Sequence, residues 1–243
     1  MKTISFEAKY LKDAQLFYRD YCHHDHSILF ESAEIVAKSG VQSIIGVSTA
    51  LKVSCENLVV KVEALNHNGL TLLSKLAALY KANISDNFFT VAFSRPPKNL
   101  DEATRLKAPG PLDVMRSIQH LVSECQDILI AGVISFDFIN NFEYIGDVPK
   151  GENPCDDYCY YICDIAILVN HIEKTTRVVS YAFSADTYKE TAFKALELRD
   201  ELNDFKAEDL LQIELKRNPK IDPDLSDSEF GAIVSKLKEH KHR

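Results

Sequence analysis

Four groups of side chains in this 243-residue chain have types and spacing that could support chemistry. Histidine and cysteine can ligate metals, a pair of carboxylates can transfer protons, and a carboxylate beside a hydroxyl can bind an amino acid. The four groups are the loop His23-His24-Asp25-His26, the cysteines Cys155, Cys159 and Cys163, the carboxylates Asp137 and Glu143, and the pair Glu31-Ser32.

The two possible metal-ligand groups lack the spacing of familiar metal sites. Adjacent residues of a histidine loop point in different directions, whereas tetrahedral zinc needs convergent ligands. Three residues separate each cysteine from the next, and Cys159 and Cys163 fall within the strand-like run YCYYIC. We interpret them as small buried side chains and keep metal binding as a minor alternative. GxSxG, P-loop, GxGxxG and HExxH motifs are absent from the sequence, so we expect no cofactor and no metal here.

The two carboxylate groups leave alternatives open. Asp137 and Glu143 flank an aromatic segment after an apolar run, where they can do acid–base work or cap a turn. Glu31 and Ser32 end the apolar run Ile28-Leu29-Phe30. Glu31 can point to solvent at a strand end, or the pair can form a zwitterion site in which the carboxylate holds an ammonium and apolar neighbours hold a hydrophobic group.

The hydrophobic pattern predicts an α/β (α+β) fold, with a mixed, largely antiparallel sheet and helices packed mainly on one side. We expect the run 127–136 to be a strand covered on both faces, and Glu56-Asn57 to be a tight hairpin connection. Strands are expected at 27–34, 41–47, 50–55, 58–64, 88–93, 127–136, 158–169 and 177–183, and helices at 10–22, 70–80, 111–125, 186–202 and from 226.

Composition excludes several classes of protein. The net charge is −8 and no block of Lys or Arg is present, which argues against nucleic acid as a partner. No apolar run approaches the eighteen or so residues of a transmembrane helix, and the N-terminus lacks a signal-peptide core. We therefore expect a cytoplasmic protein, with its six cysteines reduced.

Several segments, in order, resemble the N-terminal region of anthranilate synthase component I. They are ILFESAEI, VQSIIGVSTALKVSCENLVVKVEALNHNG, RLKAPGPLDVMRSIQHLV, GVISFDFINNFE, CDDYCYYICDIAILVNHIEKTTRVVSYAF and SDSEFGAIVSKLKEH. Together they run from about Tyr10 to His240. The LxES element and the segment around FDFINNFE favour this family over the related aminodeoxychorismate and isochorismate synthases.

The resemblance implies a role in tryptophan synthesis. The family converts chorismate to anthranilate with Mg²⁺, receives ammonia from a glutamine amidotransferase subunit, and is inhibited by tryptophan. In this chain the LxES element of the tryptophan pocket corresponds to Leu29, Glu31 and Ser32, while Gln42 stands where the family has a lysine. A proline of the family is also replaced near Asp13-Ala14, and both departures lie near the effector pocket of the family.

The resemblance also implies a division of the chain. We expect an N-terminal effector and scaffold domain at 1–205, a linker at 206–225, and the start of a truncated chorismate-binding domain at 226–243. This predicts a fragment that is inactive alone and associates with itself through exposed apolar surface. The alternatives are a stand-alone amino-acid binding protein, a complete enzyme using Asp137 and Glu143 or the cysteines, and the N-terminal part of a para-aminobenzoate-type synthase.

Overall fold

The computed structural model describes residues 1–22, 24–31, 41–97, 99–143, 155–207 and 223–241. The chain divides into two compact units, residues 1–207 and 208–243. The strands are β1 (Lys2–Ala8), β2 (Ile28–Glu31), β3 (Gln42–Glu56), β4 (Val59–Ala64), β5 (Phe88–Ala92), β6 (Ile130–Ile134), β7 (Tyr158–Asn170) and β8 (Thr175–Ala182). The helices are α1 (Ala14–Phe17), the π-helical turn η1 (Tyr18–Cys22), α2 (His67–Tyr80), α3 (Glu102–Leu106), α4 (Leu112–Leu121), the 3₁₀ turn η2 (Phe136–Asn141), α5 (Tyr188–Asp204) and α6 (Asp227–Lys241).

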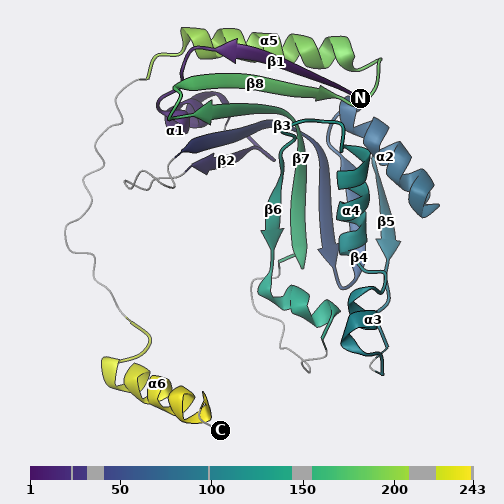
Figure 1. Ribbon diagram of the computed structural model, residues 1–243, viewed down its shortest axis with the longest axis vertical. Helices are drawn as coiled ribbons and strands as arrows, with labels where there is room; N and C mark the ends of the chain where they lie inside the picture. The colour runs from purple at the N-terminus through teal and green to yellow at the C-terminus, as the bar shows by residue number, and fades with distance from the viewer. Residues whose placement is uncertain (23, 32–40, 98, 144–154, 208–222, 242–243) are drawn as a thin grey trace. The chain divides into compact units, whose positions relative to one another are not determined.

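The first unit contains one eight-stranded sheet built around two long strands, β3 and β7 (Figure 1). The strand order is β1-β8-β7-β3-β4-β5, and all pairings among the described strands are antiparallel. Each long strand also pairs with a short strand at one end: β2 joins the start of β3, and β6 joins the start of β7. The mixed α/β class with an antiparallel sheet is therefore confirmed.

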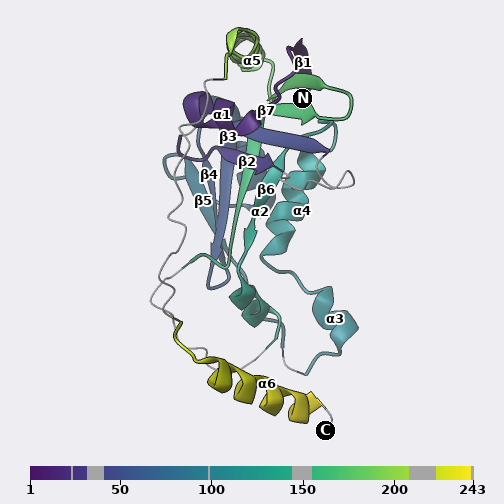
Figure 2. The ribbon, with the colours of Figure 1, turned by 90° about the vertical axis from the view of Figure 1, so that its left-hand side faces the viewer.

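Helices pack on both faces of this sheet, so the expectation that they pack mainly on one side is wrong. One core joins α2 and α4 to β3, β4 and β7, and a second core joins α1 and α5 to β3, β7 and β8. Val178 belongs to the second core and its neighbour Val179 to the first. Because successive strand residues point to opposite faces, the two cores lie on opposite sides of β8. Figure 2 shows α5 on one side of the strands and α4 on the other.

Two expected strands, 41–47 and 50–55, are wrong as separate elements, because Gln42–Glu56 forms one strand. The pairing of β3 with β7 shifts register between Gly46 and Leu51, so the strand continues through β-bulges. A bulge adds a residue and locally disturbs the hydrophobic alternation, which made one long strand resemble two. The predicted hairpin after it is confirmed, with Asn57 and Leu58 at φ 51° and 67° as tight two-residue turns require.

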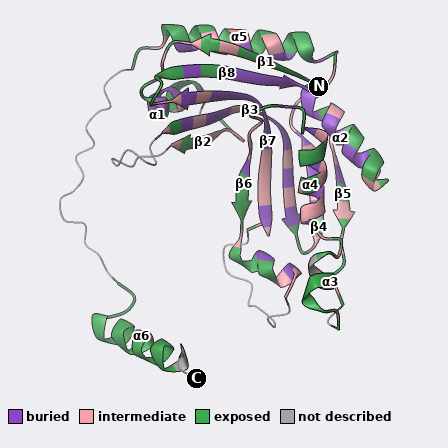
Figure 3. Cartoon of the chain, viewed as in Figure 1, coloured by how far each residue is buried: buried purple, intermediate pink, exposed green. Residues whose placement is uncertain are grey.

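The expectation that 127–136 is covered on both faces is also wrong. The strand there is the short β6, which pairs with β7, and Val133 is 70% exposed (Figure 3). An apolar run shows which residues a strand contains, but not which strands lie beside it. The sequence of this edge strand therefore looked like that of a central strand. β1 and α3 were not anticipated; β1 pairs with β8 through a mostly exposed or half-buried set of residues.

The second unit contains α6, whose predicted capping box is confirmed. The Ser226 backbone N–H donates to the Glu229 carboxylate at 2.8 Å, and the Glu229 N–H lies 3.4 Å from the Ser226 hydroxyl. The linker expected at 206–225 falls largely on residues 208–222, outside the described part of the chain. Among the helices of the described residues, none has the length and apolar character needed to cross a bilayer.

Candidate functional site

The strand β2 positions two of the four predicted site residues. Glu31 lies opposite Ser43 of β3, and Leu29 lies opposite Ile45. Directly paired residues share a face of the sheet, so Leu29 and Glu31 point to the same side as Ser43 and Ile45. This is the side of the second core, against which Leu29 packs. We call it the inner face. Ser32, the third predicted residue, lies outside the described residues.

A chain of hydrogen bonds crosses the inner face beside Glu31. The Ser43 hydroxyl lies 2.7 Å from Nε2 of His171, and the Tyr10 hydroxyl lies 2.9 Å from Nδ1 of the same ring. The His171 backbone N–H also donates to the Val41 carbonyl at 2.9 Å, which fixes the β7–β8 turn to the start of β3. A serine–histidine contact can activate a nucleophile. Ser43 is completely buried, however, so a substrate cannot reach it and the contact is structural.

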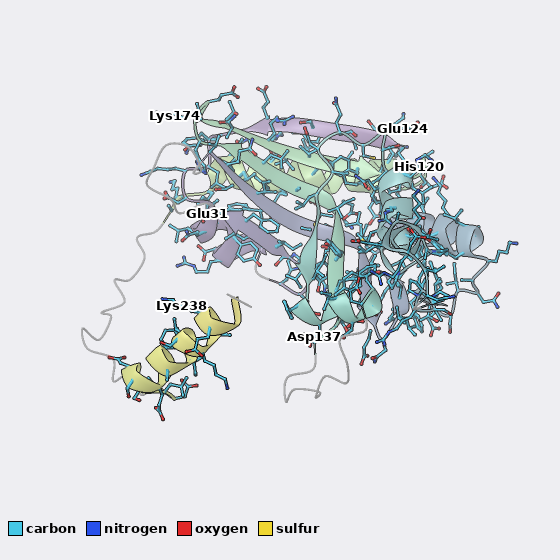
Figure 4. All side chains as sticks on the ribbon, turned by 60° about the horizontal axis from the view of Figure 1, so that its bottom comes forward. Glu31, His120, Glu124, Asp137, Lys174 and Lys238 are labelled. Atoms are coloured by element: carbon cyan, nitrogen blue, oxygen red, sulfur yellow. The ribbon has the colours of Figure 1, made fainter. Side chains whose placement is uncertain are left out.

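Glu31 contributes an unsatisfied group to this face. Its Oε2 atom is buried and has no hydrogen-bond partner among the described residues. A buried carboxylate oxygen without a donor is costly, so such atoms call for an explanation such as an unseen ligand or water. Figure 4 shows Glu31 near the end of the sheet that also carries Lys174 of the β7–β8 turn.

Gln42, the fourth predicted residue, lies on the opposite face. It is adjacent to Ser43 in β3, so its side chain points the other way, and it is exposed. There it lines a groove of about 300 Å³, which we call the outer groove. The structure thus brings Leu29 and Glu31 together and separates both from Gln42.

The outer groove combines apolar side chains with opposite charges. Ile44 and Leu168 are direct partners in the β3–β7 pairing, and Leu168 pairs in turn with Arg177 of β8. The Arg177 guanidinium lies 3.3 Å from the Asp127 carboxylate in a half-exposed ion pair. The remaining lining residues used below are Gln42, Leu129 and Glu173.

The segment that forms one wall of the outer groove is fixed to the sheet. The Tyr181 hydroxyl donates to the Gln126 carbonyl at 2.8 Å, and the Cys163 backbone N–H donates to the Leu129 carbonyl at 3.0 Å. Between these anchors Asp127 has φ 58°, a left-handed conformation that Asp tolerates better than most residues. Burial raises the pKa of the Cys163 thiol to about 11, so the side chain of this residue stays neutral at neutral pH.

The other chemical candidates do not form sites in the described residues. Glu143 makes an ion pair with Arg105 at 2.6 Å, and Asp137 is exposed in η2. Cys163 is buried, Cys159 is half-buried and Cys155 is exposed. No group of three or more His, Cys, Asp or Glu residues in the described ranges has a metal-binding arrangement. His24 and His26 belong to an exposed or half-buried loop, while His23 is outside the described residues.

Sequence reasoning missed His171, Tyr10 and the Asp127–Arg177 pair. His171 stands in the polar turn between two expected strands, which gave no sign that its ring reaches Ser43. Asp127 and Arg177 are fifty positions apart and meet because β8 pairs with β7 beside the anchored wall. The only available signal was an isolated Asp at the start of an apolar run, which by itself is common.

Comparison with known proteins finds relatives of one kind. The chain is 27% identical to anthranilate synthase component 1 from Vibrio cholerae over 255 residues, 29% to that from Haemophilus influenzae over 243, and 27% to that from Escherichia coli over 250. These alignments include 99%, 95% and 98% of this chain. The chain is thus similar along nearly its whole length to part of anthranilate synthase component I.

The similarity covers only part of each relative. The alignments cover 47%, 46% and 47% of the three relatives, so the chain spans about half the length of the curated relatives it matches. No protein-family model matches the chain. The crystal structure of anthranilate synthase component I from Streptococcus pneumoniae TIGR4 aligns with 78% of this chain and 34% of its own, with a TM-score of 0.40 and 13% identity. That likeness is too weak to support an argument.

Proposed function

We propose that this chain is the N-terminal effector and scaffold part of an anthranilate synthase component I and is inactive alone. The observation that carries the proposal is the extent of the similarity, which includes 99% of this chain but 47% of the Vibrio cholerae relative. The complete protein would convert chorismate and ammonia to anthranilate, as the resemblance implies for the family. Residues beyond this chain would supply the chemistry.

The proposed organisation follows the resemblance. Residues 1–205 would form the effector and scaffold domain, 206–225 a linker, and 226–243 the beginning of the chorismate-binding domain. Leu29, Glu31, Ser32 and Gln42 would contribute to a tryptophan effector site. Mg²⁺ would bind with chorismate outside this chain. A glutamine amidotransferase subunit would be the partner, and the cytoplasm the location.

A pairing experiment tests this function. The chain is coexpressed with the remaining half of the Vibrio cholerae relative, and anthranilate fluorescence is measured with chorismate, Mg²⁺ and ammonia. We expect no product from either half alone and product from the pair. Product from this chain alone would contradict the proposal, and so would a pair that associates but stays inactive. A product that is 4-amino-4-deoxychorismate instead of anthranilate would support the para-aminobenzoate branch.

A stand-alone amino-acid binding protein is the second candidate. It is favoured by the outer groove, whose apolar and charged residues all come from this chain. Saturable binding of an amino acid, together with no activity in the pairing experiment, would support this candidate over the first.

Self-association is a further expectation of the proposed function. Val133 and Phe136 are 70% and 86% exposed, and Ile134 between them is 48% exposed. Large exposed apolar side chains gathered in one short segment can mark an interaction site. Light scattering across a range of concentrations should show a mass that rises with concentration, whereas a monomer at high concentration would contradict the expectation.

A further inference from the structure

We propose that the free edge of β6 pairs with β6 of a second copy of this chain, in an antiparallel arrangement centred on Gly132. The inference rests on the self-association expected above, and it names the surface and the geometry that would produce it. Among the described strands, β6 pairs with β7 alone, and Figure 1 shows it at the margin of the sheet.

Two hydrogen bonds show which backbone groups of β6 point away from the sheet. The Ser135 N–H donates to the Asp157 backbone carbonyl at 2.9 Å, and the Leu129 carbonyl accepts from the Cys163 N–H at 3.0 Å. Successive residues of a strand direct their N–H and C=O groups to opposite sides, so the odd-numbered residues of β6 bond to β7. The residues whose N–H and C=O groups point outward are therefore Ile130, Gly132 and Ile134. These groups have no backbone partner in the ranges that the structure describes.

The sequence of β6 is complementary to itself. The strand reads IAGVI, with an isoleucine at each end and Gly132 in the middle. When two copies run antiparallel about Gly132, Ile130 of one copy lies opposite Ile134 of the other, and every outward-facing residue meets another. The three pairs of positions can form about six hydrogen bonds. A shift by one residue would place outward-facing groups against inward-facing ones, so the backbone excludes it.

The edge lacks the features that usually prevent such pairing. Natural edge strands are protected by charged side chains, proline or bulges. From Ile128 to Phe136 the sequence contains no charged residue and no proline, and the pairing of β6 with β7 has no register shift. β1, at another margin of the sheet, carries Lys2 and Glu7. β6 can therefore accept a second strand more readily than β1.

The face of β6 that carries the two isoleucines also has a groove for the second copy. Ile130 lines this groove of about 360 Å³ together with Leu112 and Met115 of α4 and Tyr160 of β7. Ile134 is 48% exposed in the single chain. Because directly paired residues share a face, Ile134 of the second copy would lie beside Ile130 and enter the groove. The two-fold symmetry makes this contact twice, so both exposed isoleucines lose contact with water.

Sedimentation velocity of the whole chain over a range of concentrations tests the proposal. We expect a monomer in equilibrium with a dimer, because two-fold pairing uses the free edge of both copies and then stops. A chain that stays monomeric at high concentration would overturn the proposal. Assembly that continues beyond the dimer would overturn it as well, because a closed pair leaves no further β6 edge.

Two matched variants locate the interface. Ile134→Lys would bring an ammonium group to the apolar groove of each copy and should weaken dimerisation by roughly tenfold or more. The control is Ile172→Lys in the β7–β8 turn, where the side chain is 69% exposed, and we expect its dimerisation to match that of the original chain. Circular dichroism checks that both variants are folded. Equal dimerisation of the two variants would overturn an interface at β6.

Amide hydrogen exchange identifies the paired backbone without any substitution. Exchange at Gly132 and Ile134 should slow by roughly tenfold or more as the dimer forms, because each N–H gains a carbonyl partner in the second copy. The Val133 N–H already points to β7, so its exchange should change less. A dimer in which the Gly132 and Ile134 amides exchange at the monomer rate would overturn the proposal.

The result is separate from that of the proposed function. The pairing experiment measures anthranilate, which does not require two copies of this chain. Loss of the dimer would therefore overturn the β6 interface and leave the synthase function standing. A pair of halves that associates but stays inactive would overturn the function and leave the β6 interface standing.

Discussion

The two faces of β3 near its start differ in how completely their polar groups are satisfied. On the inner face, Ser43 contacts His171, which also contacts Tyr10 and the Val41 carbonyl. On the outer groove, Arg177 and Asp127 share one long contact and are half-exposed. The polar groups of the inner face, except Glu31, thus bond to one another and support the structure. The polar groups of the outer groove still have hydrogen-bonding positions available for a ligand.

This contrast separates residues that sequence similarity groups together. Leu29, Glu31 and Gln42 are all assigned to one effector site by resemblance, yet the sheet places Gln42 on the face opposite the other two. A strand alternates faces at each step, so neighbours in a motif need not share a site. Substitutions at neighbouring positions can test whether the two faces of β3 differ in this way.

Adjacent isoleucines of β3 provide the largest expected contrast. Ile45 is completely buried in the inner core, and Ile44 is half-buried beside the groove. Ile45→Ala should lower the free energy of unfolding by about 2–5 kcal/mol, because it removes buried apolar contacts and leaves a cavity. Ile44→Ala should cost clearly less. Urea unfolding followed by circular dichroism measures both, and equal losses would mean that the two faces are equally packed.

His171→Ala tests whether the inner network is structural. It would leave the completely buried Ser43 hydroxyl without its partner, which should cost about 1–3 kcal/mol. The control is Glu173→Ala, two positions along in the same turn, where an exposed side chain should contribute within about 0.5 kcal/mol. Chemical denaturation of both variants gives the comparison. A neutral His171→Ala would remove the basis for calling the inner face structural.

Gly46→Ala tests the close approach behind the groove wall. The added methyl would meet the Cys163 sulfur and Leu129 at distances that force one of them to move. Overpacking of this kind costs about 1–3 kcal/mol. Thermal unfolding measures the loss, and full stability would show that the wall is not held by this contact.

High pH should affect the groove wall through the Cys163 thiol. Burial raises its pKa from 9.0 to about 11, so the folded state binds this proton more tightly than the unfolded state. The resulting stability is complete below pH 9 and declines as the pH rises from 9 through 11. Relative to Cys163→Ala, the original chain should lose on the order of 1 kcal/mol between pH 8 and pH 10. Urea titrations at these two pH values test this, and parallel losses in both chains would contradict it.

Much of the fold could be predicted from local pattern. The hairpin at Asn57, the helices α2 and α5, and the capping box at Ser226 depend on signals within a few residues. The continuity of β3 could not be predicted, because its bulges break the alternation that marks a strand. The exposure of β6 could not be predicted either, since it depends on which strands lie beside it.

The candidate site was predictable only in part. Resemblance assigns Gln42 and Glu31 to one effector site, but it could not show that the two residues lie on opposite faces of the sheet. Arg177 and Asp127 become neighbours through the pairing of β7 with β8 and a wall fixed by Tyr181. These contacts join residues that are far apart in the sequence, so a single sequence does not show them.

Chemical-shift mapping with L-tryptophan on the isotope-labelled whole chain tests the central claim most directly. The claim is that the outer groove keeps its polar groups available to a ligand, whereas the inner face supports the fold. It predicts saturable shifts concentrated at Ile44, Leu168 and Arg177, with small changes at Ile45 and Ile167 of the inner core. Shifts concentrated instead at Leu29, Glu31 and Ser43 would contradict the claim and place the ligand on the inner face.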